Sequence, residues 1–357
     1  MLEKLTLKDA KVRNQNVLVR VDYNVPLKDG VITDDLRIKA SLPTIEYLIK
    51  KGARRVILIS HLGRPGGKRV KELSLKPVAE RLKELLKDQK VGFVSDVSGP
   101  DVEEAVEKTP VGGVLLLENL RFFPGEEENS SEFAREIAEC TRADLFVQDG
   151  FAVIHRAHAS TDAITKELPS VAGFLVEKEV SALNKVATSP AHPFLIVIGG
   201  AKVDDKQPLI DKLSPLADNI FVGGKIAADG YTSSNSKIHV CDAFKADSEG
   251  VKRDIGAPCI EALLELAKGA KTVLWNGTLG QVEEPEFAEG SAKFAEFLGT
   301  HPEITSVVCG GDTAGFAENF LKAHPDCSFS LISTGGGASL ELLSGLDLPG
   351  LDALDDA

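Results

Sequence analysis

Ten short runs of apolar and β-branched residues recur along the chain, and they constrain its fold more than any other feature. They are residues 17–21, 56–59, 91–94, 114–117, 145–147, 195–198, 219–222, 272–275, 306–308 and 329–332. Runs of this length and composition are typical of strands that are buried on both faces of a parallel sheet. Helical patterns lie between several of them; Val78, Leu82, Leu85 and Leu86, for example, would form one apolar helix face. Strands that alternate with helices predict right-handed βαβ units and hence an α/β fold.

The length of the chain predicts two domains rather than one. The chain has 357 residues, whereas a domain commonly holds about 100–200, and ten strands are more than a typical sheet contains. Residues 174–186 predict a connecting helix, and the following Ser189-Pro190-Ala191-His192-Pro193 segment is a stiff, non-helical entry to the second half. We therefore expect two parallel sheets, with the break between Phe151 and Pro193.

Composition and charge exclude several classes of function. With 43% apolar and 27% charged residues, the chain is typical of a globular protein. Its net charge of −13 argues against a nucleic-acid partner. The longest apolar stretch, residues 194–198, is too short to span a bilayer, and residues 1–6 lack the apolar run of a signal peptide. We expect a cytoplasmic monomer with no nucleic-acid or membrane partner.

Two local features have simple structural interpretations. The five cysteines are scattered, odd in number and without a C-x-x-C motif, which predicts reduced thiols rather than a disulfide framework or a zinc site. The run Glu126-Glu127-Glu128 is interpreted as a solvated acidic loop.

The residues that follow the predicted strands differ between the two halves of the chain. In the first half they are charged or polar: Arg20, Asp22, Asn24, His61, Arg64, Asn119, Arg121, Asp149, His155, Arg156 and His158. In the second half they are glycines, at positions 199–200, 223–224, 277, 310–311 and 335–337. Ligands of parallel α/β sheets bind at the carboxyl ends of the strands. Guanidinium groups suit an anion there, and glycines let backbone N–H groups approach phosphates. Two anion sites suggest transfer of a phosphoryl group between them.

Each of these features also has a structural alternative. A single arginine at a strand end is usually a surface charge, and paired glycines also serve tight turns. Four arginines at successive strand ends (Arg20, Arg64, Arg121 and Arg156) would repel one another without an anion. Lys202 and Lys206, four residues apart, would do the same on one side of a helical turn. The triple glycine at 335–337, between a strand and a helical pattern, is interpreted as an anion nest.

Two common nucleotide-binding motifs do not occur in the sequence. There is no G-x-x-x-x-G-K-[ST] segment, and no G-x-G-x-x-G segment follows a predicted strand. The chain is therefore neither a P-loop NTPase nor a plain Rossmann dehydrogenase.

Eight motifs, in order along the whole chain, together resemble those of phosphoglycerate kinases. They are RVDYNVP (20–26), HLGRP (61–65), LLENLRF (116–122), HRAHAS (155–160), GGAKV (199–203), WNG (275–277), GGDT (310–313) and STGGGASL (333–340). The resemblance implies reversible phosphoryl transfer between ATP and the carboxylate of 3-phosphoglycerate, giving ADP and 1,3-bisphosphoglycerate, with Mg²⁺ accompanying the nucleotide.

The resemblance also implies residues for each substrate. Phosphoglycerate would be bound by Asp22, Tyr23, Asn24, Arg37, His61, Leu62, Gly63, Arg64, Arg121 and Arg156. The nucleotide would be bound by Gly200, Ala201, Lys202, Lys206, Asn276, Glu283, Gly310, Gly311, Asp312 and Thr313, with Asp312 as the magnesium ligand. The acceptor carboxylate is ionised at pH 7, so no general base is needed. Alignment and charge neutralisation then supply the catalysis, and we expect these from Arg37, Lys202, Lys206, Gly335, Gly336 and Gly337.

The implied architecture is two Rossmann-like domains, each a parallel sheet flanked by helices, joined by a hinge helix. Residues 1–172 with a C-terminal tail 340–357 would bind phosphoglycerate, 173–187 would form the hinge helix, and 188–339 would bind the nucleotide. Closure about the hinge would bring the substrates together and exclude water.

The sequence departs from the family pattern mainly in the nucleotide half. Residues 224–254 are shortened, Thr278 replaces a proline, and Gln148 replaces an asparagine. Lys252 and Arg253 replace Gly-Leu and put two cations beside the expected adenine pocket. Two alternatives to an ATP-dependent phosphoglycerate kinase therefore stay open. One is a carboxylate kinase that uses another donor or acid, and the other is a non-catalytic phosphoglycerate-binding homologue.

Overall fold

The chain folds into two compact units, each built around its own parallel sheet. The computed structural model describes residues 3–201, 204 and 206–357. The first unit comprises Met1–Val180 and Asp347–Ala357, and the second comprises Ser181–Leu346. The helix α6 (Phe174–Thr188), which the sequence predicted over residues 174–186, contains the boundary between them. The predicted two-domain α/β class is confirmed.

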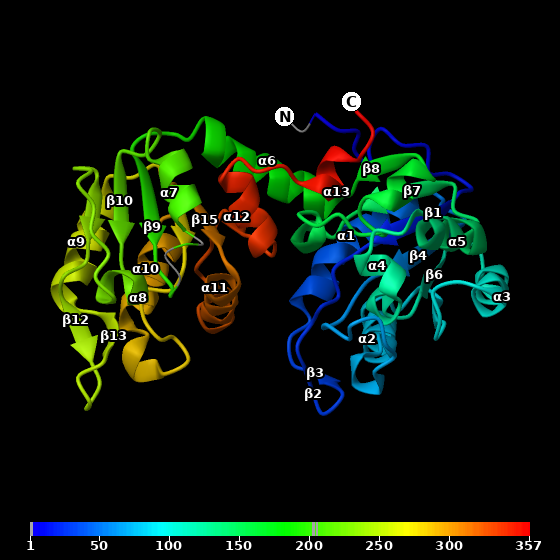
Figure 1. Cartoon of the computed structure of the whole chain (residues 1–357), viewed down its shortest axis with the longest axis horizontal. Coiled ribbons are helices and arrows are strands. Elements are labelled where there is room, and N and C mark those ends of the chain that lie inside the picture. The colour runs from blue at the N-terminus through cyan, green and yellow to red at the C-terminus, as the bar shows by residue number, and fades with distance from the viewer. Residues whose placement is uncertain (1–2, 202–203, 205) are drawn as a thin grey trace. The chain divides into compact units, whose positions relative to one another are not determined.

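The sheet of the first unit has six parallel strands. Their spatial order is β5 (Val91–Phe93), β6 (Gly113–Leu116), β4 (Arg55–Ile59), β1 (Asn16–Arg20), β7 (Leu145–Gln148) and β8 (Ser170–Ala172). The helices that flank it in Figure 1 include α1 (Leu36–Lys50), α2 (Lys76–Leu85), α3 (Pro100–Lys108) and α5 (Ser131–Thr141). The chain order reverses between β1 and β7, so the carboxyl ends of these strands form the crevice where ligands of such sheets bind.

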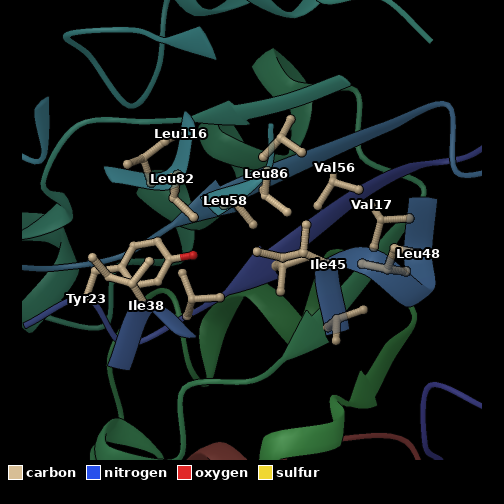
Figure 2. Close-up of a cluster of buried hydrophobic side chains, with 14 of the residues drawn as sticks. Val17, Tyr23, Ile38, Ile45, Leu48, Val56, Leu58, Leu82, Leu86 and Leu116 are labelled. Carbon is tan, nitrogen blue, oxygen red and sulfur yellow. The ribbon is translucent and has the colours of Figure 1, made fainter. Parts of the chain in front are cut away.

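The core of the first unit lies between the sheet and the helices α1 and α2. Val17, Val56, Leu58 and Leu116 of the strands are fully buried and pack with Ile45, Leu48 and Leu82 of the helices (Figure 2). Each such side chain contributes about 1.5–3 kcal/mol when it is withdrawn from water. This core fixes the strand ends, and therefore the side chains that follow them.

The sheet of the second unit is also six-stranded and parallel. Its order is β11 (Ile238–Val240), β10 (Asn219–Val222), β9 (Phe194–Ile198), β14 (Thr272–Asn276), β15 (Thr305–Cys309) and β16 (Leu331–Ile332). The chain order reverses between β9 and β14, which places the ligand crevice at their carboxyl ends. Its helices include α7 (Gln207–Leu213), α8 (Gly224–Ala228), α9 (Ala257–Lys268), α10 (Glu289–Gly299), α11 (Gly311–Ala323) and α12 (Gly337–Leu343).

Two antiparallel hairpins lie outside the sheets. The strands β2 (Leu27–Lys28) and β3 (Val31–Ile32) pair in the first unit. The strands β12 (Phe244–Ala246) and β13 (Lys252–Ile255) pair in the second. The shortened segment 224–254 therefore folds as α8, β11 and most of the β12–β13 hairpin.

The C-terminal residues return to the first unit. Within this tail, α13 (Pro349–Asp352) is held by the Gly350 N–H, which donates to the Ile154 carbonyl at 2.8 Å. Asp355 accepts from the Ser170 N–H at 2.9 Å. The tail in the structure begins at Asp347 rather than at residue 340, because α12 packs on α7 in the second unit.

The prediction of reduced thiols is wrong for two of the five cysteines. Cys241 and Cys259 form a disulfide, with their Cα atoms 5.6 Å apart, while Cys140, Cys309 and Cys327 are not disulfide-bonded. Cys241 follows β11 and Cys259 lies in the first turn of α9, so the hairpin between them brings the two thiols together. In the part of the chain that the structure describes, no helix is both long and apolar enough to cross a membrane.

Candidate active site

The carboxyl end of β1 supplies a carboxylate that faces the first turn of α1. Asp22 is buried and forms an ion pair with Arg37, whose side chain is one-third exposed. Tyr23 lies in the core, with its hydroxyl 2.9 Å from the Ser41 hydroxyl (Figure 2). The structure therefore brings Asp22 and Arg37 together, whereas the Tyr23 side chain faces inward, away from them.

His61, which follows β4, is held in a buried, positively charged environment. Arg20 Nη2 lies 3.2 Å from His61 Nδ1, and Asp22 Oδ1 lies 3.9 Å from the same nitrogen. Because a guanidinium group can only donate, Nδ1 accepts and the proton of the ring resides on Nε2. Burial, and then the charges of Arg20, Arg121 and Arg37, hold the pKa of His61 well below its usual 6.5. His61 is therefore a neutral hydrogen-bond donor at pH 7.

A buried chain of polar contacts lies behind His61. Arg20 is fully buried, and its Nε donates to the Ser160 hydroxyl at 2.8 Å. That hydroxyl donates to Glu126 Oε1 at 2.6 Å, and the Ser160 N–H donates to Glu126 Oε2 at 3.0 Å. Glu126 Oε1 is also 3.9 Å from Arg20 Nη2. Arg20 therefore supports His61 from behind instead of facing solvent as an anion ligand.

The interpretation of residues 126–128 as a solvated loop is wrong for Glu126. Its side chain is fully buried in the short helix α4 (Pro124–Glu127), whereas that of Glu127 is 42% exposed. The reason is Arg20, because a guanidinium group buried at the end of β1 requires a counter-charge in the protein. Nothing in a run of three glutamates indicates which of them turns inward.

The loop after His61 is fixed by side chains that follow two other strands, β1 and β6. The Gly63 N–H donates to Asn24 Oδ1 at 2.9 Å, and Arg121 Nη1 donates to the Gly63 carbonyl at 2.9 Å. Asn119 bonds both the N–H and the carbonyl of Leu62, at 3.2 and 2.7 Å. Gly63 has φ of +64°, a conformation that favours glycine. The structure thus brings Asn24, Leu62, Gly63 and Arg121 together.

The remaining basic residues of the first unit extend the positive charge. Arg156 Nε lies 3.2 Å from His155 Nε2, and Arg64 is exposed one residue beyond Gly63. Burial, followed by Arg156 and Arg121, lowers the pKa of His155 to about 4. Burial, followed by Arg121, Arg20 and Arg156, lowers that of His158 to about 4. This end of the sheet is therefore a positively charged surface suited to a small anion.

In the second unit, glycines let the ends of β9 and β14 approach closely. The Gly199 N–H donates to the Asn276 carbonyl at 2.9 Å, and the Gly200 N–H donates to the Thr278 carbonyl at 2.8 Å. A Cβ atom at Gly277, where φ is +101°, would overlap the Gly199 carbonyl. The paired glycines therefore form a backbone surface with no side chain over it.

Polar side chains surround this surface. Lys206 Nζ donates to the side-chain oxygen of Asn276, which is fully buried. Thr313 Oγ1 accepts from the Gly277 N–H at 2.9 Å. Lys206 immediately precedes α7, which begins at Gln207. The structure brings Lys206, Asn276 and Thr313 together, while Lys202 lies outside the described residues.

A cavity of about 280 Å³ opens beside these groups. Gly200, Ala201, Glu283 and Asp312 line it, as do residues of the β12–β13 hairpin. Glu283 and Asp312 also line a second cavity of about 610 Å³. Gly310, with φ of +95°, precedes α11, so Gly311 and Asp312 form its first turn.

The triple glycine lies apart from both cavities. Gly336, with φ of +53°, precedes α12, which begins at Gly337, and Gly335 is buried. None of the three lines either cavity, as far as the described residues define them.

The exposed carboxylates at this cavity are chemically suited to magnesium. Among the described residues no group of three or more His, Cys, Asp or Glu side chains could hold a metal ion alone. Mg²⁺, however, is often bound by one or two carboxylates together with substrate phosphates. Asp312 and Glu283 present such hard oxygen donors at the edge of the cavity. They fit an ion that arrives with a nucleotide.

Comparisons with known proteins give a consistent result over the whole chain. The model of the family described as phosphoglycerate kinase matches residues 7–238 and 228–346. The phosphoglycerate kinases of Pseudothermotoga lettingae and Moorella thermoacetica are each 42% identical, with 99% of this chain covered and 99% and 100% of theirs. Among solved structures, phosphoglycerate kinases from Pyrococcus horikoshii (TM-score 0.86, 30% identity) and Coxiella burnetii (0.79, 33%) each cover 98% of both chains. The chain belongs to the phosphoglycerate kinase family.

Proposed function

We propose that this chain catalyses reversible phosphoryl transfer from a nucleoside triphosphate, ATP in the family's reaction, to the carboxylate of 3-phosphoglycerate. The observation that carries the proposal is full-length family membership, combined with a basic strand-end surface in one unit and a glycine-lined surface in the other. We place the enzyme in the cytoplasm as a monomer, where it acts on small molecules alone.

Phosphoglycerate binds at the first unit in this proposal. Arg64, Arg121 and Arg156 attract its phosphate, and the neutral His61 donates a hydrogen bond from Nε2. Asp22 holds Arg37 by an ion pair, which orients the guanidinium group for the transferred phosphoryl group. The roles of Asp22, Asn24, Leu62 and Gly63 are to position these groups. Tyr23 contributes through its backbone, because its side chain lies in the core.

The nucleotide binds at the second unit. Lys206 and Lys202 neutralise its phosphates, and Asn276, Thr313 and the glycines at 200 and 310–311 approach them closely. The acceptor carboxylate is already ionised, so the protein needs to align the reactants and stabilise the charge of the moving group. Asp312 would hold Mg²⁺ together with phosphate oxygens, and the ion would supply further charge neutralisation.

One substrate on each unit requires the units to approach during the reaction. We infer that the unit boundary within α6 acts as the hinge and that closure excludes water from the transferred group. The glycines at 335–337 then contribute backbone N–H groups to the closed state.

The test is a steady-state assay of 3-phosphoglycerate phosphorylation with a panel of nucleoside triphosphates. We expect turnover that is lost in Lys206→Ala, while a matched change of an exposed lysine, Lys268→Ala, retains it. If the unaltered chain turns over no faster than Lys206→Ala with every donor, the proposed function is wrong.

A further inference from the structure

The cavity of about 280 Å³ in the second unit has two chemically different ends. One end lies at the carboxyl ends of the strands, where Gly200, Thr278 and Asp312 line it. The other end lies at the β12–β13 hairpin, where Phe244, Lys252 and Arg253 line it. Because the glycines and Lys206 suit phosphates, a nucleotide bound here would direct its base toward the hairpin.

The backbone holds Arg253 and Gln281 side by side at this second end. The Gln281 N–H donates to the Arg253 carbonyl at 2.9 Å, and Asp254 forms a β-bridge with Gly280. Arg253 Nη1 also donates to Gln281 Oε1 at 2.9 Å. The two side chains therefore form one wall with a defined orientation.

This wall presents hydrogen-bond donors, most of them on Arg253. Arg253 Nε donates to Asp247 Oδ2 at 2.7 Å, and the Gln281 oxygen already accepts from Arg253. The Gln281 amide nitrogen donates to Glu284 Oε1 at 2.7 Å. A guanidinium group carries five N–H donors, and Arg253 uses two of them here. Because the Arg253 side chain is 35% exposed, its other donors stay available to a ligand.

The ion pair between Arg253 and Asp247 determines which kind of hydrogen-bond acceptor suits the remaining donors of Arg253. Asp247 neutralises the charge of Arg253, so the wall favours a neutral acceptor over another phosphate. Phe244, the aromatic residue among the described residues of this lining, has Lys252 Nζ 4.4 Å from its ring centroid. That ring face is thus covered by a cation, and hydrogen bonds at the edge of the base become the main means of recognition.

We propose that this wall selects guanine, so that GTP is the preferred phosphoryl donor. Guanine presents two acceptors, O6 and N7, on one edge, and arginine bonds both of them. Adenine places its N6 amino group at the corresponding position, where a donor would face the Arg253 donors. This inference rests on the proposed function, because it names the donor for that reaction.

The experiment measures kcat/KM of the full chain with GTP, ITP, ATP and UTP at saturating 3-phosphoglycerate. A well-placed bidentate contact discriminates by about 1–3 kcal/mol, so we expect GTP to exceed ATP by at least about 5-fold. ITP, which retains O6 and N7, should behave as GTP does. An ATP value equal to or above the GTP value in the unaltered chain overturns the proposal.

Variants distinguish the effect of the paired donors of the Arg253 guanidinium group from the effect of its charge and from misfolding. Arg253→Leu and Arg253→Lys should both abolish the preference, mainly through KM for GTP, because lysine keeps the charge but not the fork. Lys268→Ala, outside the cavity lining, is the matched control and should keep the preference. Unchanged circular dichroism shows that the variants fold. A GTP preference that survives in both folded Arg253 variants also overturns the proposal.

A failure of guanine selection can be distinguished from a failure of the proposed phosphoryl transfer. If no donor supports turnover, calorimetry with GDP and ADP replaces the kinetic comparison. Tighter GDP binding, lost in Arg253→Leu, then supports selection of guanine by a protein that is not a kinase. Equal or tighter ADP binding overturns the proposal.

Discussion

Replacement of Glu126 by glutamine should destabilise the first unit strongly, although the change adds no bulk. Glu126 is fully buried, accepts two hydrogen bonds from Ser160 and is the nearest carboxylate to the buried Arg20 guanidinium. The variant removes the nearer of the two carboxylates that act on this cation, the other being Asp22, and turns an amide toward groups that also donate. Loss of one partner of a buried ion pair costs about 3–5 kcal/mol. With an m value of about 2 kcal/mol per M, a loss of about 4 kcal/mol lowers the urea midpoint by about 2 M.

The adjacent Glu127 provides the matched control. It is 42% exposed and lies 3.3 Å from Arg121, so Glu127→Gln should cost only about 0–1 kcal/mol. Circular dichroism follows both units, whereas the single tryptophan, Trp275, is buried in the second unit and reports on that unit alone. The Glu126→Gln transition by circular dichroism should therefore move to lower urea than the tryptophan transition. Equal midpoints for the Glu126 and Glu127 variants would refute the assigned role of Glu126.

Three further changes test other parts of the molecule. Arg37→Ala should lower kcat by at least about 10²-fold with a smaller change in KM if Arg37 acts on the transferred group; an effect on KM alone would make it a binding residue. The pKa values of His155 and His158 are lowered to about 4 in the folded protein, so the unfolded chain binds more protons between pH 6.5 and 4. Stability of the first unit should thus be fully present above pH 6.5 and fall as the pH drops toward 4, and a flat urea midpoint over this range would contradict it. Replacing both Cys241 and Cys259 by serine should destabilise the second unit by about 3 kcal/mol, measured by Trp275 fluorescence, because their disulfide closes a loop with a sequence separation of 18. A midpoint equal to that of the oxidised chain would show that the cross-link adds nothing.

The fold was largely predictable because buried parallel strands carry continuous apolar runs. All ten predicted runs overlap strands of the two sheets. The edge strands β8 and β11 were missed because Ser170 and His239 leave each of them with only two apolar residues. At an edge, a strand is held by its single neighbour and needs no apolar run of its own. The sequence pattern therefore predicts the middle of each sheet better than its edges.

The candidate site was predictable only where a residue type has one main use. Asn24 was indicated as a polar residue after a buried strand, whereas Gly63 was indicated only by the resemblance to phosphoglycerate kinases; the structure joins the two by a hydrogen bond. Glu126 and the pair Cys241–Cys259 carried no such indication. Their environment depends on where α4 and the β12–β13 hairpin pack, which is a tertiary property.

Not all of the arginines at the strand ends indicate that an anion binds from solution. Arg20 has Glu126 within 3.9 Å and Arg121 has Glu127 within 3.3 Å, so the protein itself supplies counter-charges for two of the four. Mutual repulsion is therefore weaker support for a ligand than the sequence alone suggests. The histidines give a better argument. After burial, which is the largest cause, the charges of Arg20, Arg121 and Arg37 lower the pKa of His61. Three guanidinium groups therefore act on this ring, and a bound phosphate would offset their charge.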